Sequence, residues 1–334
     1  MTSSLTTERV YNISAITAAG SAVALGFIQP VTLLGYVAAP LCGAVGGFIT
    51  GLIFQDRKEV YDRVYRHKYC RIAPCMEILP RGAAWEAACK RIQEHPAFPK
   101  FLELKGFSCA EEGMKFLTNN MAAGSCLGQS AALVKTVIKT KQVLTPGLLQ
   151  TIEPQEVLFL QLLDDIMAPI ERKKLSIAAD LVNDIDADED EYEELCLLQR
   201  KMEQENPGLG RAKISSDEIS CFNSTTEFQN ELHDLIQDAD GRDLVGRINI
   251  DVFTETTNST GETMRTYVEG GGHTFFFHRL SHGACYFYDC LNATGGLFKY
   301  SDEMTFIKAL QERIYLQKKQ TFGNNCVVDF QVFS

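Results

Sequence analysis

The chain has 334 residues, with 32 basic and 43 acidic side chains and a formal net charge of −11 at pH 7. Because 45% of the residues are hydrophobic, the chain can bury a core, which excludes a disordered protein. The acidic balance excludes a general nucleic-acid binder, since phosphate contacts need clustered lysine and arginine. The 11 cysteines include no CxxC pair, which excludes a zinc ribbon and favours free thiols in a reducing compartment.

The N-terminal region is strongly apolar. No charged residue occurs from Val10 to Gln55, and residues 13–54 are nearly all apolar or small. One helix of that length would be about twice as long as the ~30 Å hydrocarbon core of a bilayer. We therefore expect a transmembrane helical hairpin with a turn near Pro30 or between Gly35 and Pro40, and small residues at every fourth position favour close helix packing in lipid. A buried hairpin of a soluble protein is the alternative.

The residues after this segment set its expected orientation. The stretch from Arg57 to Lys68 is rich in arginine and lysine, and such flanks tend to stay in the cytoplasm. Two crossings would place residues 1–9 on the same side. Residues 1–55 are thus predicted to be a tail and membrane hairpin.

The rest of the chain predicts an α+β body in which helices come first and an antiparallel sheet follows. Residues 56–118 form a predicted helical juxtamembrane region, broken by prolines. Leu127–Lys141 has the apolar spacing of a core-facing helix. Residues 152–206 are again helical, interrupted by the acidic run Asp184–Glu194, which we interpret as solvated surface.

From about Val245 the pattern changes to strands separated by turn signals. The predicted strands are Arg247–Thr254, Thr263–Val268, His273–Leu280, Cys285–Leu291 and Cys326–Phe333. We assign 119–334 to a single domain.

Cys126 is a candidate nucleophile. It lies in the segment Gly124-Ser125-Cys126-Leu127-Gly128-Gln129-Ser130, directly before the predicted helix. A thiol at a helix N-terminus is favoured as thiolate by the helix dipole and by unsatisfied N–H groups. The glycines at 124 and 128 are expected to let a substrate backbone approach. The alternative is a cysteine that serves only as a small hydrophobic side chain.

His273 and Asp289 are the candidate partners of this thiol. His273 opens one predicted strand and Asp289 ends the aromatic part of the next. If the two strands pair as a hairpin around Ser281–Ala284, their open ends meet and Asp289 can accept a hydrogen bond from the imidazole. His278 is expected on the opposite face of the strand, and His282 in the turn.

The order Cys126, His273, Asp289 resembles papain-like cysteine proteases, whose histidine follows the nucleophile by ~130–150 residues. The Gly-x-Cys-x-Gly-x-Ser pattern at residues 124–130 is most similar to YopT-type effector proteases of pathogenic bacteria. The likeness covers about residues 119–300. It departs at Leu127 and Val134, where aromatic residues are common, and in the acidic helical region.

The resemblance implies a papain-like fold, a helical lobe plus an antiparallel sheet, behind the membrane hairpin. It implies that Cys126 attacks a carbonyl, His273 transfers the proton and Asp289 holds the imidazole. It also implies an oxyanion hole made by the Cys126 N–H and a side-chain amide, for which Asn120 is preferred to Asn119. An Asn-Asn pair is equally typical of a helix cap or turn. No cofactor and no metal are expected.

Other functions stay open at this point. The same three residues can support acyl transfer or deamidation, and a catalytically inactive, membrane-tethered interaction module is a further alternative. A zinc site would use His273, His278, His282, Cys285 and Cys290, but strand alternation scatters these side chains to both faces.

The hydrophobic segment resembles those of chlamydial inclusion membrane proteins. That resemblance implies a secreted bacterial effector inserted in a host or vacuole membrane through residues 13–54, with its catalytic domain in host cytosol. Its expected partners are the bilayer and a membrane-associated host protein substrate, with no nucleic acid.

Overall fold

The computed structural model describes residues 67–334 except 122–123, 183–187, 210–213, 216–218, 221–241, 258–262, 268–271, 291–294, 321–325 and 334. The predicted membrane hairpin, residues 13–54, lies outside the described residues and stays a prediction. Within the described ranges, no helix has both the length and the hydropathy needed to cross a membrane. The compact unit considered below runs from Tyr69 to Ser334.

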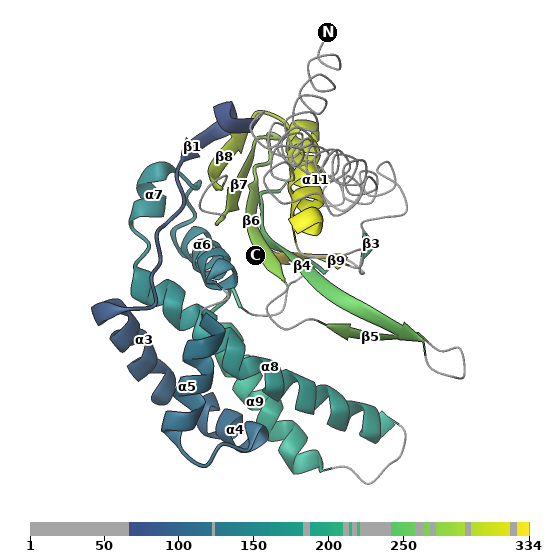
Figure 1. Cartoon of the computed structure of the whole chain (residues 1–334). Helices are drawn as coiled ribbons and strands as arrows, with labels where there is room; N and C mark the ends of the chain where they lie inside the picture. The colour runs from purple at the N-terminus through teal and green to yellow at the C-terminus, as the bar shows by residue number, and fades with distance from the viewer. Residues whose placement is uncertain are drawn as a thin grey trace, which may run out of the picture. The chain divides into compact units, whose positions relative to one another are not determined.

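Helices form the first part of this unit (Figure 1). After a short η1 (His67–Cys70) and strand β1 (Arg71–Ala73) they are α3 (Gly82–Gln93), α4 (Ala97–Lys105), α5 (Ala110–Asn120), α6 (Cys126–Thr140), α7 (Pro146–Gln150), α8 (Pro154–Val182) and α9 (Glu189–Glu205). The long α8 is the centre of this layer, because α3, α4, α6 and α9 all pack on it.

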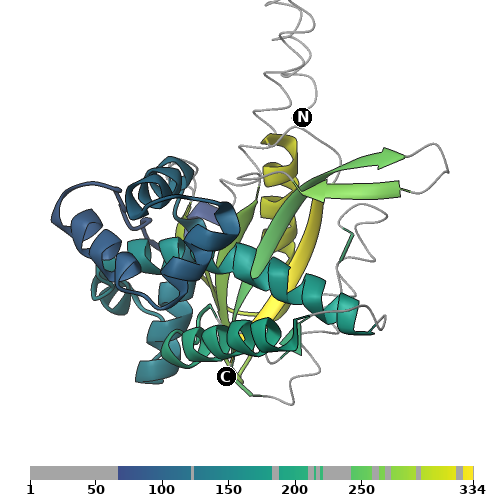
Figure 2. The same ribbon diagram turned by 90° about the horizontal axis from the view of Figure 1, so that it is seen from below.

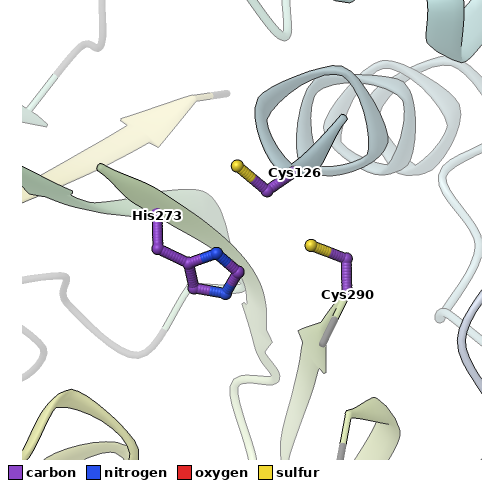
Figure 3. A group of neighbouring side chains, drawn as sticks. All are labelled: Cys126, His273 and Cys290. Carbon is purple, nitrogen blue, oxygen red and sulfur yellow. The ribbon is translucent and has the colours of Figure 1, made fainter. Parts of the chain in front are cut away.

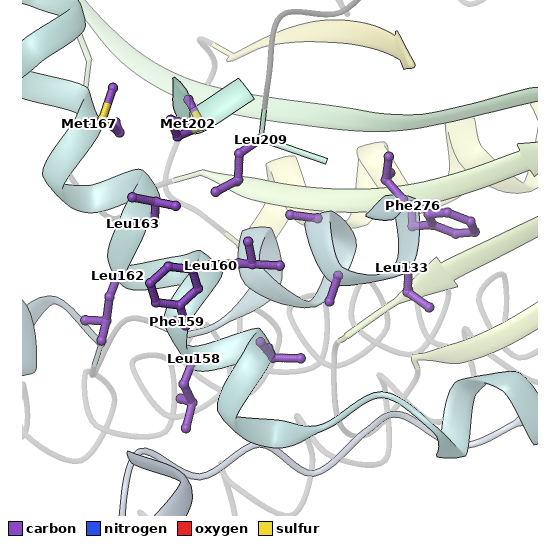
Figure 4. Close-up of a cluster of buried hydrophobic side chains, with 14 of the residues drawn as sticks. Leu133, Leu158, Phe159, Leu160, Leu162, Leu163, Met167, Met202, Leu209 and Phe276 are labelled. Carbon is purple, nitrogen blue, oxygen red and sulfur yellow. The ribbon is translucent and has the colours of Figure 1, made fainter. Parts of the chain in front are cut away.

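The apolar residues of α8 explain why it occupies the centre. Leu158, Leu162, Ile166 and Ile170 repeat every four positions, so they form one apolar stripe, and all are fully buried. Leucines at the neighbouring positions 160 and 163 are buried too, so α8 is covered on more than one side. Figure 4 shows part of this core, which includes Leu133 of α6 and Met202 of α9.

Two helical predictions need correction. Residues 71–73 form a strand and the chain from there to Pro80 is not helical, so within the described part of the predicted helical region, residues 67–118, the first α-helix begins at Gly82. The acidic run does not interrupt the helices along its whole length, because its second half starts α9. There the Asp188 side chain accepts a hydrogen bond from the Glu191 N–H at 2.9 Å. Acidic side chains stabilise the positive end of a helix dipole, which explains their place in the first turn.

The described strands form one nine-stranded sheet in which all pairs are antiparallel. The strand order is β1-β8-β7-β6-β4-β9-β2, with β5 paired to β4 and β3 to β9. The strands after β1 are β2 (Ile214–Ser215), β3 (Ile219–Ser220), β4 (Leu244–Thr257), β5 (Thr263–Tyr267), β6 (His273–Arg279), β7 (Cys285–Asp289), β8 (Gly296–Tyr300) and β9 (Cys326–Phe333). All five predicted strands are present, whereas β8 and the following α11 (Glu303–Gln320) were not predicted.

Both faces of the sheet are covered, which explains the run of three phenylalanines in β6. Phe276 belongs to the core shared with the helices. Phe275 and Phe277 belong to a second core on the other face, which α11 closes with side chains such as Phe306. Figures 1 and 2 show α6 and α8 on one side of the strands and α11 on the other. Helices first and an antiparallel sheet after them confirm the α+β prediction at this level.

Candidate active site

Cys126 is the first residue of α6, as the sequence predicted, and its thiol is partly buried. Gly124 leads into the helix with a φ of 129°, a value that favours glycine. One turn into α6, the Ser130 hydroxyl donates to the carbonyl of Thr274 in β6 at 3.3 Å. The start of α6 therefore lies against the start of β6, and the thiol is at the positive end of the helix dipole.

Gly128 has a different role from the one expected. A Cβ at this position would come within 2.4 Å of the Val157 carbonyl oxygen in α8. The Gly128 N–H also donates to the Gln161 side chain of α8 at 3.0 Å. Gly128 therefore lets α6 pack closely on α8 and does not face a substrate. Around Gly124 no atom of the described residues lies within 4 Å of an added Cβ, and the approach of a substrate backbone there stays a prediction.

The β6–β7 hairpin brings His273 and Asp289 together. Its register pairs Arg279 with Cys285 near the turn and Phe276 with Tyr288 near the open end. At that open end, His273 Nε2 lies 3.0 Å from Asp289 Oδ1. His273 is 6% exposed and Asp289 is fully buried, so this contact is shielded from water.

The other two histidines of the region do not join this group. His278 lies on the opposite face of β6, next to Tyr286 of the helix-facing core. Burial lowers the pKa of His278, and its Nδ1 has no hydrogen-bond partner among the described residues. His282 is exposed in the turn. Strand alternation thus selects His273, as predicted.

Arg313 of α11 holds the second oxygen of the Asp289 carboxylate. Its Nη1 donates to Asp289 Oδ2 at 2.8 Å, and the arginine is 3% exposed. The guanidinium also lies 4.8 Å above the ring centroid of Phe298. From the preceding segment, the Cys75 thiol donates to the Asp289 backbone carbonyl at 3.2 Å. Sequence reasoning missed both residues, because neither belongs to a motif and only the packing of α11 and of residues 74–79 places them here.

The site favours a thiolate–imidazolium ion pair. A hydrogen bond from the Cys290 thiol is the largest influence on Cys126 and, together with His273 and the Thr274 backbone, holds the Cys126 pKa well below its usual value. Burial is the largest influence on His273 and opposes its charge. The hydrogen bonds and charges of Asp289 and Cys126 outweigh this effect and raise the His273 pKa to about 10. With Asp289 and Arg313 also charged, the buried cluster contains two negative and two positive groups.

A second thiol, Cys290, also lies at this point; the sequence named it only as a possible ligand in the zinc alternative. The Sγ atoms of Cys126 and Cys290 and a ring nitrogen of His273 all lie within 4.8 Å of one another. Figure 3 shows the three side chains together, from α6, from the end of β7 and from β6. Within the described ranges this is the one group of three or more potential metal ligands that converges. This group differs from the zinc alternative drawn from the sequence. Two residues of that alternative lie elsewhere in the structure: Cys285 is in the core beneath α11, and His278 is on the opposite face of β6.

The predicted oxyanion residue Asn120 is the last residue of α5 and is exposed. Asn119 precedes it in the same turn and is exposed too. No contact among the described residues links either amide to Cys126. Their proposed role therefore stays a prediction.

The site has the chemical components of a Cys-His-Asp triad. The thiol opens a helix of the helical layer and the imidazole opens a strand of the sheet, an arrangement compatible with a papain-like fold. Comparison with protein-family models, with curated proteins and with solved structures finds no match for the chain. The function must therefore be argued from the site itself.

Proposed function

We propose that this protein is a cysteine-type peptidase with a papain-like arrangement of its catalytic residues. One observation carries the proposal: a thiol at the N-terminus of α6 contacts a buried imidazole whose Nε2 is held by Asp289 at 3.0 Å. A nucleophile, a base beside it and a third group that orients the base together define this class of site.

The proposal gives each group a step. The Cys126 thiolate attacks the peptide carbonyl, and the resulting oxyanion accepts a hydrogen bond from the Cys126 backbone N–H, with Asn120 proposed as the second donor. Because Asp289 accepts the hydrogen bond from Nε2 of His273, it is the Nδ1 of the imidazolium that donates its proton to the leaving amine. The neutral imidazole then takes a proton from water, which attacks the thioester and releases the carboxylic acid product.

The place of action is a separate proposal, supported by the uncharged stretch from Val10 to Gln55. We propose that residues 13–54 anchor the chain in a bacterial vacuole membrane or another host-cell membrane. The peptidase would then meet membrane-associated host proteins at a raised effective concentration. A secreted effector is the setting that the resemblance to inclusion membrane proteins and YopT-type proteases implies.

The catalytic proposal is tested with an electrophilic peptide on the full-length protein. Mass spectrometry should find the label on Cys126, and Cys126→Ala should remove it, whereas the exposed Cys109 serves as a matched control in Cys109→Ala. Uniform, slow labelling of several cysteines would instead indicate an inactive interaction module.

The reaction type is tested by the products formed on co-expressed host proteins. New chain termini that are absent with Cys126→Ala indicate hydrolysis. A mass change without new termini would indicate acyl transfer or deamidation and would overturn the peptidase assignment.

The membrane proposal has its own test. Tags at the N-terminus and at position 60 should show the same accessibility to added protease, because two crossings return the chain to the same side. Opposite accessibility indicates a single crossing. Release of the protein from membranes by alkaline carbonate would remove the membrane assignment.

A further inference from the structure

The Cys-His-Asp triad does not by itself require a second thiol beside the nucleophile. A cysteine peptidase needs one nucleophilic sulfur, yet a second thiol directly follows Asp289 and lies within 4.8 Å of both Cys126 Sγ and a His273 ring nitrogen. Of the described cysteines, Cys75 also reaches this region, but its thiol is directed to the Asp289 carbonyl. Cys290 is therefore the thiol that converges with the nucleophile and the base.

Two thiols and one imidazole form the ligand set of a zinc ion. Zinc binds cysteine sulfur at about 2.3 Å and histidine nitrogen at about 2.0–2.1 Å, and sites with three protein ligands keep a fourth position for solvent or substrate. A tetrahedral zinc ion would hold such ligand atoms about 3.6–3.8 Å apart. The separations here, all within 4.8 Å, need only small side-chain rotations to reach that geometry. The absence of oxygen donors from this group disfavours Ca²⁺ and Mg²⁺.

The surroundings of His273 match those of a metal-binding histidine. Ligating histidines usually donate their second ring N–H to a carboxylate, which fixes the ring and increases its basicity. His273 Nε2 has that partner in Asp289 at 3.0 Å, and Arg313 fixes the carboxylate at 2.8 Å. The nitrogen left for a metal is Nδ1, which Figure 3 shows on the side of the two sulfurs.

We propose that Cys126, His273 and Cys290 form a Zn²⁺ site that reversibly blocks the nucleophile. Zinc binding takes up both thiolates and the Nδ1 lone pair, and the protons of the Cys290 thiol and of Nδ1 pass to solvent. The Cys126 sulfur lone pair then belongs to a zinc–sulfur bond and cannot attack a carbonyl. Metal binding itself follows from the ligand set, whereas its inhibitory effect rests on the proposed peptidase function.

Cobalt(II) serves as a spectroscopic probe for the metal site, because thiolate–cobalt bonds give an intense charge-transfer absorption. Full-length protein, kept reduced and metal-free, should bind one Co²⁺ with the absorption of two thiolates, and one equivalent of Zn²⁺ should remove that signal. Absence of a thiolate–cobalt band in wild-type protein would overturn the proposal without reference to any variant.

Variants assign the ligands. Cys290→Ser should reduce zinc affinity by at least about 100-fold, as measured with a competing chromogenic chelator, and should remove about half of the charge-transfer intensity. Asp289→Asn should weaken zinc binding by about 10–100-fold, as expected for the loss of a carboxylate that holds a ligating histidine. The matched control Cys109→Ser should behave as wild type. Equal zinc affinity in Cys290→Ser and wild type would exclude Cys290 as a ligand and overturn the site.

Inhibition is measured separately through labelling of Cys126. Zinc should block the electrophilic peptide, and a chelator should restore labelling. Cys290→Ser should need at least about 100-fold more zinc for half-protection, relative to its own zinc-free rate. If wild-type protein shows the cobalt band but never reacts with the peptide, the peptidase proposal fails and the metal site stands. If the peptide labels Cys126 but no cobalt band appears, the metal site fails and the peptidase proposal stands.

Discussion

His273 and His278 lie on the same strand and are buried to nearly the same extent, 6% and 4% exposed, yet their pKa values shift in opposite directions. Burial disfavours the charged form of both rings. His278 faces the helical core, where the charge of Asp243 does not offset this effect. His273 contacts a carboxylate and a thiolate, which raise its pKa to about 10. The comparison shows that charged partners, and not exposure, decide whether a buried histidine is held as the charged imidazolium.

The largest expected effect comes from removing His273, measured against removal of either neighbouring histidine. His273→Ala should lower the rate of Cys126 labelling at neutral pH by about 100-fold or more, because the thiolate loses its cationic partner. His278→Ala and His282→Ala should retain most of the wild-type rate. Peptide labelling followed by mass spectrometry measures this. Loss of labelling in a folded His282→Ala protein, with His273→Ala active, would show that the assigned strand register is wrong.

The second effect concerns Asp289, the partner that distinguishes the two histidines. Asp289→Ala should slow turnover by ~10–10³-fold, since the nucleophile and base remain but the imidazolium loses its support. Full burial of Asp289 between His273 and Arg313 also predicts a stability loss of about 3–5 kcal/mol, because two buried cations lose their counter-ion. A cleft carboxylate would instead leave the melting temperature nearly unchanged.

Asp289→Asn is the conservative comparison. The amide oxygen can still accept the imidazole N–H, so both the rate and the stability should fall less than in Asp289→Ala. Rate and thermal midpoint measured on both variants decide the question. Full activity in a folded Asp289→Ala protein would contradict the triad.

The third effect is the pH dependence of thiol reactivity. Cys75, Cys89 and Cys126 all have intermediate exposure, but burial raises the pKa of Cys75 and of Cys89 to about 11, whereas the pKa of Cys126 is lowered. At pH 6 iodoacetamide should therefore modify Cys126 at least about 10-fold faster than either other thiol. Turnover should decline as the pH rises through about 10, where His273 loses the proton it donates. Equal modification of the three thiols at pH 6 would contradict the ion pair.

The smallest effect is on acid stability, and it tests His278. Its folded-state pKa is lowered, so its contribution to stability is present above the unfolded value of about 6.5 and is lost as the pH falls below it. His278→Phe removes the titrating group, so its melting temperature should fall less between pH 7 and pH 5 than that of wild type, by about 1–3 °C. His282→Ala is the control and should follow wild type. An identical pH dependence in all three proteins would show that His278 is not buried as a neutral ring.

The sequence by itself determined the elements that have local signals. The small-residue segment before an apolar 3.6-residue period predicted that Cys126 opens a helix. The turn residues Ser281–Ala284 between two aromatic runs predicted two strands whose open ends meet if they pair as a hairpin, and they do pair. These features depend on neighbours within a few residues or across one turn, so a single sequence carries them.

Only the tertiary structure decided which distant side chains complete the site. Arg313 comes from a helix that the sequence did not predict, and Cys75 from a segment predicted to be helical. Cys290 meets Cys126 only because α6 lies against the start of β6, and Gly128 leaves room for the backbone of α8 to pack closely against α6. Such contacts depend on how layers pack over long sequence separations, where no short-range pattern records the partner. The charge states of Cys126 and His273 follow from that packing, because the pKa of each group is set by the partners that the fold supplies.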